Sequence, residues 1–198
     1  MQIDKLIEGQ YFHIFNRGVN GEDIFKEERN YYYFLQQYQL YCSDVFDTYA
    51  YALLKNHFHM LVYVKEAVEQ PRKDGAGIYK LVASKQLSHF FNSYAQSINK
   101  FHNRTGPLFE SPFERKVITS DQYLTSVIYY LHYNAQLHGF VKDFKDWKFS
   151  SYHSIAANDN TWLASQKVLN WFGGVTEFQK AHRNTYTDNE MTKKFILE

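Results

Sequence analysis

The stretch FDTYAYALLKNHFHMLVYV, residues 46–64, decides the fold class of this chain. Its two halves, 46–54 and 58–64, are rich in aromatic and β-branched residues, which indicates two strands. The polar pair Lys55-Asn56 lies between them and forms a short turn. Strands joined by so short a connection lie antiparallel, so the stretch predicts a β-hairpin.

The residues on both sides of the hairpin extend it into a mixed domain. We expect, in chain order, a strand over 11–16, a helix over 27–41, the two hairpin strands, a helix over 78–102, a strand over 116–119 and a helix over about 120–137. A loop is predicted over 66–77, which contains Pro71, Gly75 and Gly77. This order predicts an α+β fold, with a ferredoxin-like antiparallel sheet and helices packed on it.

Length and composition set limits but leave function open. The 198 residues suit one domain over 1–155 with a C-terminal helical extension of that domain over 156–198. The one cysteine, Cys42, excludes an internal disulfide, and no segment resembles a signal peptide or a membrane span, so we expect a cytoplasmic protein. The net charge of +1 means that any affinity for nucleic acid must come from local clusters of Lys and Arg. Most of the 17 Tyr and 17 Phe are expected to fill the core.

Two histidines open the second strand of the hairpin. Side chains alternate faces along a strand, so His57 and His59 project from one face, roughly 6.5 Å apart. Such a pair can hold one divalent ion, and a zinc site of four protein ligands lacks its cysteines here. His13, on the first strand, can approach the same place as a supporting residue. Taken alone, the spacing also fits histidines that only pack.

A tyrosine-rich helix carries the second candidate group. Tyr130 and Asn134 are four residues apart and lie on one helix face. A phenol beside an amide oxygen fits a nucleophile next to a ligand for Mg²⁺ or Mn²⁺. Spacing alone also admits Tyr129 with Tyr133, or Tyr123, and it admits tyrosines that only pack.

Taken together, these motifs give the chain a likeness to a known family. It resembles the IS200-like tyrosine transposases of the HUH (His-hydrophobic-His) endonuclease superfamily, and in particular their REP-associated branch. The resemblance covers about residues 8–155. The motifs that carry it are Tyr11–Ile14 with Asn16–Gly18, Lys55–Val62, Asn103–Phe109, Tyr130–Asn134 and Lys145–Tyr152. One departure is Ala135, where the family commonly has proline, and this is expected to shift the helix end without removing chemistry.

The resemblance implies a ferredoxin-like fold and an activity. His57, His59 and Asn134 become ligands of Mg²⁺ or Mn²⁺, and Tyr130 becomes the nucleophile that cleaves single-stranded, hairpin-associated DNA through a 5′-phosphotyrosine link. The implied function is that of a transposase: an endonuclease that also rejoins strands, on its own or as a homodimer.

Basic residues near the motifs are candidates for contacting DNA phosphates. They are Arg17, Lys55, Arg104, Arg115 and Lys116, with Arg72 and Lys73 of the predicted loop as further candidates. Three other functions also fit the residues. These are a catalytically silent DNA-hairpin-binding protein derived from a transposase, a related enzyme of replication initiation or plasmid relaxation, and a metal-dependent hydrolase unrelated to DNA.

Overall fold

The computed structural model describes residues 4–67, 69–71, 77–159 and 161–184. The candidate pair Arg72 and Lys73 lies outside these residues. The elements are, in chain order, β1 (Tyr11–Arg17), the 3-10 turn η1 (Val19–Gly21), α1 (Glu28–Cys42), β2 (Phe46–Leu54), β3 (His57–Val64), β4 (Glu69–Pro71), β5 (Ile78–Lys80), α2 (Ala83–Phe101), β6 (Glu114–Val117), α3 (Asp121–Leu137), the 3-10 turn η2 (Phe144–Asp146), α4 (Tyr152–Ala156), α5 (Ser165–Phe172) and α6 (Val175–Asn184).

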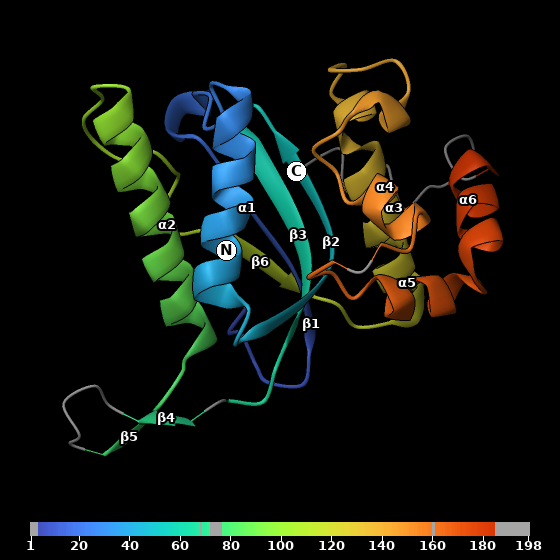
Figure 1. Cartoon of the computed structure of the whole chain (residues 1–198), viewed down its shortest axis with the longest axis horizontal. Coiled ribbons are helices and arrows are strands. Elements are labelled where there is room, and N and C mark those ends of the chain that lie inside the picture. The colour runs from blue at the N-terminus through green and yellow to red at the C-terminus, as the bar shows by residue number, and fades with distance from the viewer. Residues whose placement is uncertain (1–3, 68, 72–76, 160, 185–198) are drawn as a thin grey trace.

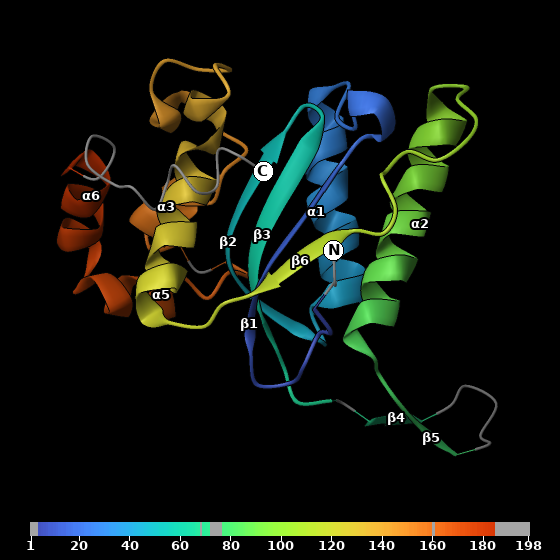
Figure 2. The same ribbon diagram turned by 180° about the vertical axis from the view of Figure 1, so that it is seen from behind.

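Four strands form one antiparallel sheet in the order β2-β3-β1-β6. With one helix between β1 and β2 and another between β3 and β6, this is the ferredoxin-like topology, so the predicted fold class is confirmed. Figure 1 shows α1 and α2 on one side of the sheet and α3 to α6 on the other, and Figure 2 shows the same layers from behind. The helices beyond α2 therefore cover the sheet face that a minimal fold of this type leaves open.

The hairpin prediction is confirmed, with β3 beginning one residue early at His57. The prediction is wrong over residues 69–71 and 78–80. Glu69–Pro71 and Ile78–Lys80 pair as a separate two-stranded ribbon, so the long helix begins only at Ala83. Ile78 is 66 % exposed, which shows that its apolar side chain does not continue the buried stripe of α2.

Alternation along β1 and β3 gives the sheet two different faces. The side chains of Phe12, Ile14, Phe58 and Met60 point toward α1 and α2 and are buried. There the ring of Phe58 lies 5.0 Å from that of Phe34 on α1, measured between centroids. The intervening residues of both strands, which include all three strand histidines, point to the opposite face.

No helix in the described part of the chain is long and apolar enough to span a membrane.

A buried chain of hydrogen bonds joins the C-terminal helix α6 to α3. His182 Nδ1 donates to the Phe178 carbonyl at 2.8 Å, so His182 Nε2 accepts from His132 Nδ1, also at 2.8 Å. His132 Nε2 then accepts from Ser151 Oγ at 2.9 Å. The Tyr133 hydroxyl also donates to the His182 carbonyl. These contacts fix the face of α3 that points away from the sheet.

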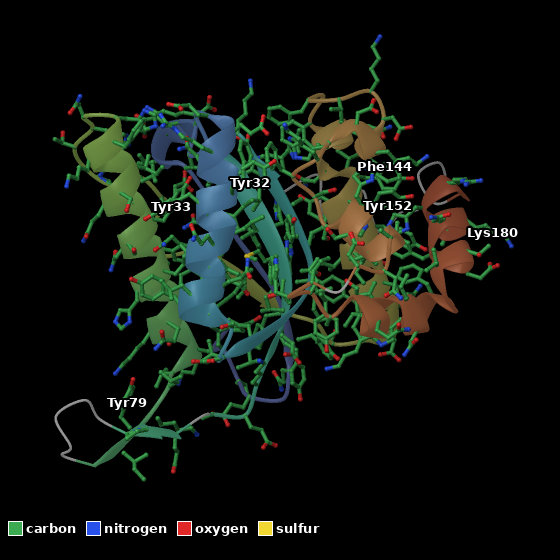
Figure 3. The ribbon with its side chains drawn as sticks, viewed as in Figure 1. Tyr32, Tyr33, Tyr79, Phe144, Tyr152 and Lys180 are labelled. Atoms are coloured by element: carbon green, nitrogen blue, oxygen red, sulfur yellow. The ribbon has the colours of Figure 1, made fainter. Side chains whose placement is uncertain are left out.

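Figure 3 shows Phe144 and Tyr152 near one another, while Lys180 points outward from α6. The rings of Phe144 and Tyr152 lie 6.0 Å and 5.2 Å from that of His182. The rings of Phe144 and Tyr152 lie 4.8 Å apart, and both side chains are buried. Burial lowers the pKa of His182 to about 4, so its ring is neutral at pH 7 and can accept from His132. The helices beyond α3 thus form a second, smaller packing layer around His132 and His182.

Replacing His182 with alanine should lower the free energy of unfolding by about 2–4 kcal/mol, because it opens a cavity and leaves buried polar atoms without partners. Urea unfolding followed by circular dichroism measures this. Lys180→Ala on the outer side of the same helix is the matched control and should stay within about 0.5 kcal/mol of wild type. Equal effects of the two substitutions would show that the buried chain contributes nothing to stability.

Candidate active site on the histidine face

His57 and His59 point to the sheet face that α3 covers. Their ring centroids are 5.3 Å apart, and His59 is 8 % exposed. In the pairing with β1, His57 lies opposite Arg17 and His59 lies opposite Phe15, so these four side chains share one face. The structure has the two histidines on a single face of the sheet, as the sequence predicts.

Helix α3 brings Tyr130 and Asn134 to the same face. The Tyr130 ring lies 5.2 Å from the His59 ring, and Asn134 Oδ1 lies 3.1 Å from His57 Nε2. Both side chains are buried. β2 presents Ala50 and Ala52 on this face, and these small side chains leave room for α3 to lie close to the sheet. The four residues singled out in the sequence, from two distant segments, are therefore adjacent in space.

The other candidate tyrosines lie elsewhere. Tyr129 packs against Phe172 and His182, with its ring 5.5 Å from the first and 4.8 Å from the second. Tyr133 donates to the His182 carbonyl on the far side of α3. The geometry therefore brings Tyr130, rather than either of these neighbours, to the histidines.

The hydrogen bonds around His57 define which nitrogen faces Asn134. Asn56 Nδ2 donates to the Gly21 carbonyl, which turns Asn56 Oδ1 toward His57 Nδ1 at 2.8 Å. The amide oxygen can only accept, so Nδ1 carries the proton and Nε2 presents its lone pair. This lone pair faces Asn134 Oδ1, which is also an acceptor.

Two acceptors at 3.1 Å with no proton between them repel one another. A cation bound to both atoms, or a turned Asn134 amide, removes the repulsion. Two donor atoms at right angles on an octahedral Mg²⁺ would be about 3.0 Å apart, given bonds of about 2.1 Å. Asn134 Nδ2 is buried and has no hydrogen-bond partner in the described part of the chain. The residues present therefore fit a divalent cation held through His57 Nε2, His59 and Asn134 Oδ1.

His13 supports His59. Its Nε2 lies 3.0 Å from His59 Nδ1, and the two rings are stacked 5.1 Å apart. When His59 Nδ1 donates in this contact, His59 Nε2 presents its lone pair, as metal-binding histidines require. His13 thus occupies the supporting position expected from its strand. Within the described residues, no cluster of three or more His, Cys, Asp or Glu could hold a metal, so a cation at this site would be held by the two histidines and the Asn134 oxygen, with water or phosphate oxygens in the other positions.

Two of three comparisons with known proteins find a protein similar to this chain. A Haemophilus influenzae protein named as a REP-associated tyrosine transposase is 27 % identical over 123 residues, which span 61 % of this chain and 67 % of that protein. A solved structure of a REP-associated tyrosine transposase bound to a REP hairpin superposes with a TM-score of 0.61 at 16 % identity, covering 79 % of this chain and 85 % of the other. No family model matches the chain.

The chain resembles the REP-associated tyrosine transposases in sequence and in fold. The resemblance predicted from the motifs is confirmed. At 16 % identity the solved structure shows the shared fold alone.

The electrostatics of the site keep its imidazoles neutral. Burial lowers the pKa of His57 to about 4, with a further contribution from the neighbouring His138. Burial lowers the pKa of His13 to about 3, and burial with the nearby His13 holds the pKa of His59 well below its ordinary value. Neutral imidazoles are the form that binds metal ions. At neutral pH the imidazoles are therefore in the form that a cation would require.

One site residue was missed in the sequence. His138, directly after α3, lies with its ring 4.8 Å from that of His57. With Tyr130 and Asn134 it continues a series spaced four residues apart, a pattern that the sequence contained. In this chain α3 continues through Ala135 to Leu137, and His138 follows it directly. The continuous helix thereby brings His138 to the histidine pair.

The predicted basic residues divide into two groups. Arg17 lies opposite His57 and Lys116 lies opposite His13, so these two lie on the face of the site, where Arg17 also forms an ion pair with Glu110 at 2.8 Å. Lys55 lies exposed on the hairpin turn, two residues before His57. Arg115 and Arg104 are not brought to the site. Arg115 lies opposite Ile14, on the other sheet face, and donates to the Asp4 carbonyl. Arg104 forms an ion pair with Glu22, at 2.7 Å, and its side chain is 14 % exposed.

Removing the amide of Asn134 should weaken metal binding. Wild-type protein is expected to bind Mn²⁺, and Asn134→Ala to bind it about 10- to 100-fold more weakly, the range found when groups that support a metal site are removed. Isothermal titration with Mn²⁺ measures both affinities. Gln37→Ala, on α1 across the sheet, serves as the control. Unchanged affinity in Asn134→Ala would contradict the assignment of Asn134 as a ligand.

Proposed function

We propose that this chain is a metal-dependent transposase that cleaves and rejoins single-stranded, hairpin-associated DNA through a 5′-phosphotyrosine intermediate. The observation that carries the proposal is the position of Tyr130 and Asn134 on one face of α3, against His57 and His59 of β3. A nucleophile, two imidazoles and an amide oxygen are thereby gathered on one sheet face. The solved relative is bound to a REP hairpin, which supports hairpin DNA as the substrate class.

In the proposed reaction the Tyr130 hydroxyl attacks a phosphorus atom of the DNA backbone. The phenol gives up its proton, the bond to the 3′ oxygen breaks, and that oxygen takes up a proton. The DNA 5′ phosphate is left joined to Tyr130. Attack by a 3′-hydroxyl on this ester reverses the exchange and rejoins a strand, so no nucleotide cofactor is consumed.

Each group of the site has a separate task in this reaction. His57, His59 and Asn134 would hold a divalent cation, which would supply positive charge at the scissile phosphate. Asn56 and His13 hold the two histidine rings so that their lone pairs face the site. α3 fixes the distance between Tyr130 and the histidines, because the side chain is buried and the ring is held against His59. The buried hydrogen bonds of His132 with His182 and Ser151, on the other side of α3, hold this helix in place.

Replacing Tyr130 with phenylalanine should abolish the covalent DNA adduct and leave DNA binding intact. Labelled hairpin DNA with an unpaired extension is incubated with protein and Mg²⁺ or Mn²⁺, denatured in detergent, and separated on a gel. Wild type should give a protease-sensitive band that EDTA prevents. Tyr129→Phe, one residue away on a different face of α3, is the matched control and should retain the band.

Several outcomes would contradict this part of the proposal. An adduct that persists in Tyr130→Phe would assign the nucleophile to another tyrosine. Binding of hairpin DNA with no adduct, across hairpins of varied sequence, would favour a catalytically silent hairpin-binding protein. An adduct that forms equally in EDTA would remove the metal from the mechanism.

Replacing Lys116 with alanine should weaken DNA binding about equally for different sequences. Lys116 lies in the row of the sheet next to the histidines, where a cation can contact a phosphate. The slope of log affinity against log salt should fall by about 0.7–0.9. Lys148→Ala, at an ion pair with Glu28 of α1, is the control and should leave the slope unchanged. An unchanged slope in Lys116→Ala would exclude the contact.

A further inference from the structure

A second group of aromatic side chains lies on the same sheet face as the histidines, toward the other end of β1 and β3. Six residues line an open hollow of about 350 Å³: Tyr11, Tyr49, Tyr63, Lys167, Asn170 and Trp171. They come from β1, β2, β3 and α5. We call this the aromatic hollow. Tyr49 belongs to the core, and Tyr11 and Tyr63 pack against it, whereas Trp171 is an exposed ring that neither the core nor the proposed cleavage chemistry explains.

The rings are arranged as a stacking surface. Trp171 lies parallel to Tyr49, with centroids 4.9 Å apart and planes 11° from parallel. Tyr11 meets both of them edge-on, at 5.1 Å from Tyr49 and 5.8 Å from Trp171. Tyr49 is 1 % exposed and forms the floor, whereas Trp171 is 37 % exposed. The hollow therefore offers the exposed surface of an indole held in a fixed orientation, which suits a flat ligand.

Basic groups lie at the rim. Lys167 Nζ is 3.2 Å from Asp47 Oδ2 and 3.3 Å from the Tyr49 hydroxyl. Lys65 Nζ is 3.2 Å from the other oxygen of Asp47. Two ammonium groups thus share one carboxylate, and these three side chains carry a net charge of about +1 at neutral pH. A flat ring that carries a negative group nearby matches this combination of an indole and a basic rim.

The register of the sheet links the hollow to the histidines. Three successive rows of this face are Phe15 with His59, His13 with Leu61, and Tyr11 with Tyr63. Four residues of strand separate His59 from Tyr63, which is about 13 Å. An extended DNA strand covers that distance in a few nucleotides. Lys116 lies opposite His13, so it adds a cation to the row between the two sites.

We propose that the aromatic hollow binds one unpaired base of the substrate strand, a few nucleotides from the scissile phosphate. The base stacks on Trp171, and a phosphate next to it contacts Lys167. This inference rests on the proposed function, since it takes the substrate to be a DNA strand that passes the histidines. Stacking of this kind is tolerant of base identity. The hollow thus sets which side of the cleavage point must be single-stranded.

The test compares a blunt hairpin with the same hairpin carrying an unpaired extension, with binding measured by fluorescence anisotropy at fixed salt. The Tyr130→Phe protein is used so that cleavage does not intervene. The extension should raise the affinity, and Trp171→Ala should remove about 5- to 100-fold of that affinity while leaving the blunt hairpin unaffected. Trp171→Phe keeps a ring and should retain most of the gain.

Two further variants distinguish loss of the base site from misfolding of the protein. Lys167→Gln keeps the aromatic rings and should weaken binding of the extended hairpin only. Tyr32→Ala removes a ring that is 58 % exposed on α1, across the sheet, and should change neither affinity. A 2-aminopurine placed in the extension should lose fluorescence on binding to the parent protein and keep it with Trp171→Ala.

The outcomes separate this inference from the proposed function. Equal affinity of the parent protein for the blunt and extended hairpins would overturn the hollow as a base site and leave the cleavage proposal standing. Equal losses on both hairpins in Trp171→Ala would overturn it as well. Displacement of the extension by free deoxynucleoside monophosphates at similar concentration would overturn DNA as the source of the base. Binding to neither hairpin would instead contradict the proposed function.

Discussion

The candidate site depends on the packing of α3 against the face of the sheet that carries the histidines. Strand alternation gives β3 one apolar face and one face with His57 and His59, and the apolar face is buried by α1 and α2. The histidine face becomes a site only where α3 adds the Tyr130 phenol and the Asn134 amide. The contact of 3.1 Å between His57 Nε2 and Asn134 Oδ1 joins these two elements.

This packing carries a cost that the rest of the structure has to offset. Two buried imidazoles, the half-buried His57 and a buried amide lie where an ordinary core would contain hydrocarbon, and burying polar groups is unfavourable unless they are paired. His13 pairs with His59, and Asn56 pairs with His57. Behind α3, the bonds from His132 to His182 and Ser151 hold the helix from its other side. These surrounding hydrogen bonds hold the site groups in position, as functional sites require.

Much of the fold could be predicted from local patterns. The hairpin has the period of a strand, and α3 has both an N-cap at Ser120 and helical spacing, so both were placed within a residue or two. The ribbon of β4 and β5 was missed, because three-residue strands carry too little pattern to distinguish them from a loop or a helix end. The start of β6 was placed two residues late, at 116 rather than Glu114.

The site was only partly accessible to the same reasoning. Both Tyr130 with Asn134 and Tyr129 with Tyr133 fit a helix face, and both faces of α3 are largely buried, so periodicity could not choose between them. The choice depends on which face meets the sheet, a property of the tertiary packing. The ion pair between Arg104 and Glu22 joins residues 82 positions apart, and no local pattern indicated it. His182 lies beyond the part of the chain that resembles the family, so its contact with His132 was not foreseen.

The central claim is that Tyr130 is the residue on α3 that reacts with DNA. Peptide mapping by mass spectrometry after incubation with hairpin DNA and Mn²⁺ tests it most directly. Fragmentation of the peptides assigns an added mass separately to Tyr123, Tyr129, Tyr130 or Tyr133. The account predicts a nucleotide mass joined through a 5′ phosphate to Tyr130 and to none of the other three. A nucleotide found on Tyr129 or Tyr133 would contradict the account, since both lie on the side of α3 that faces α6.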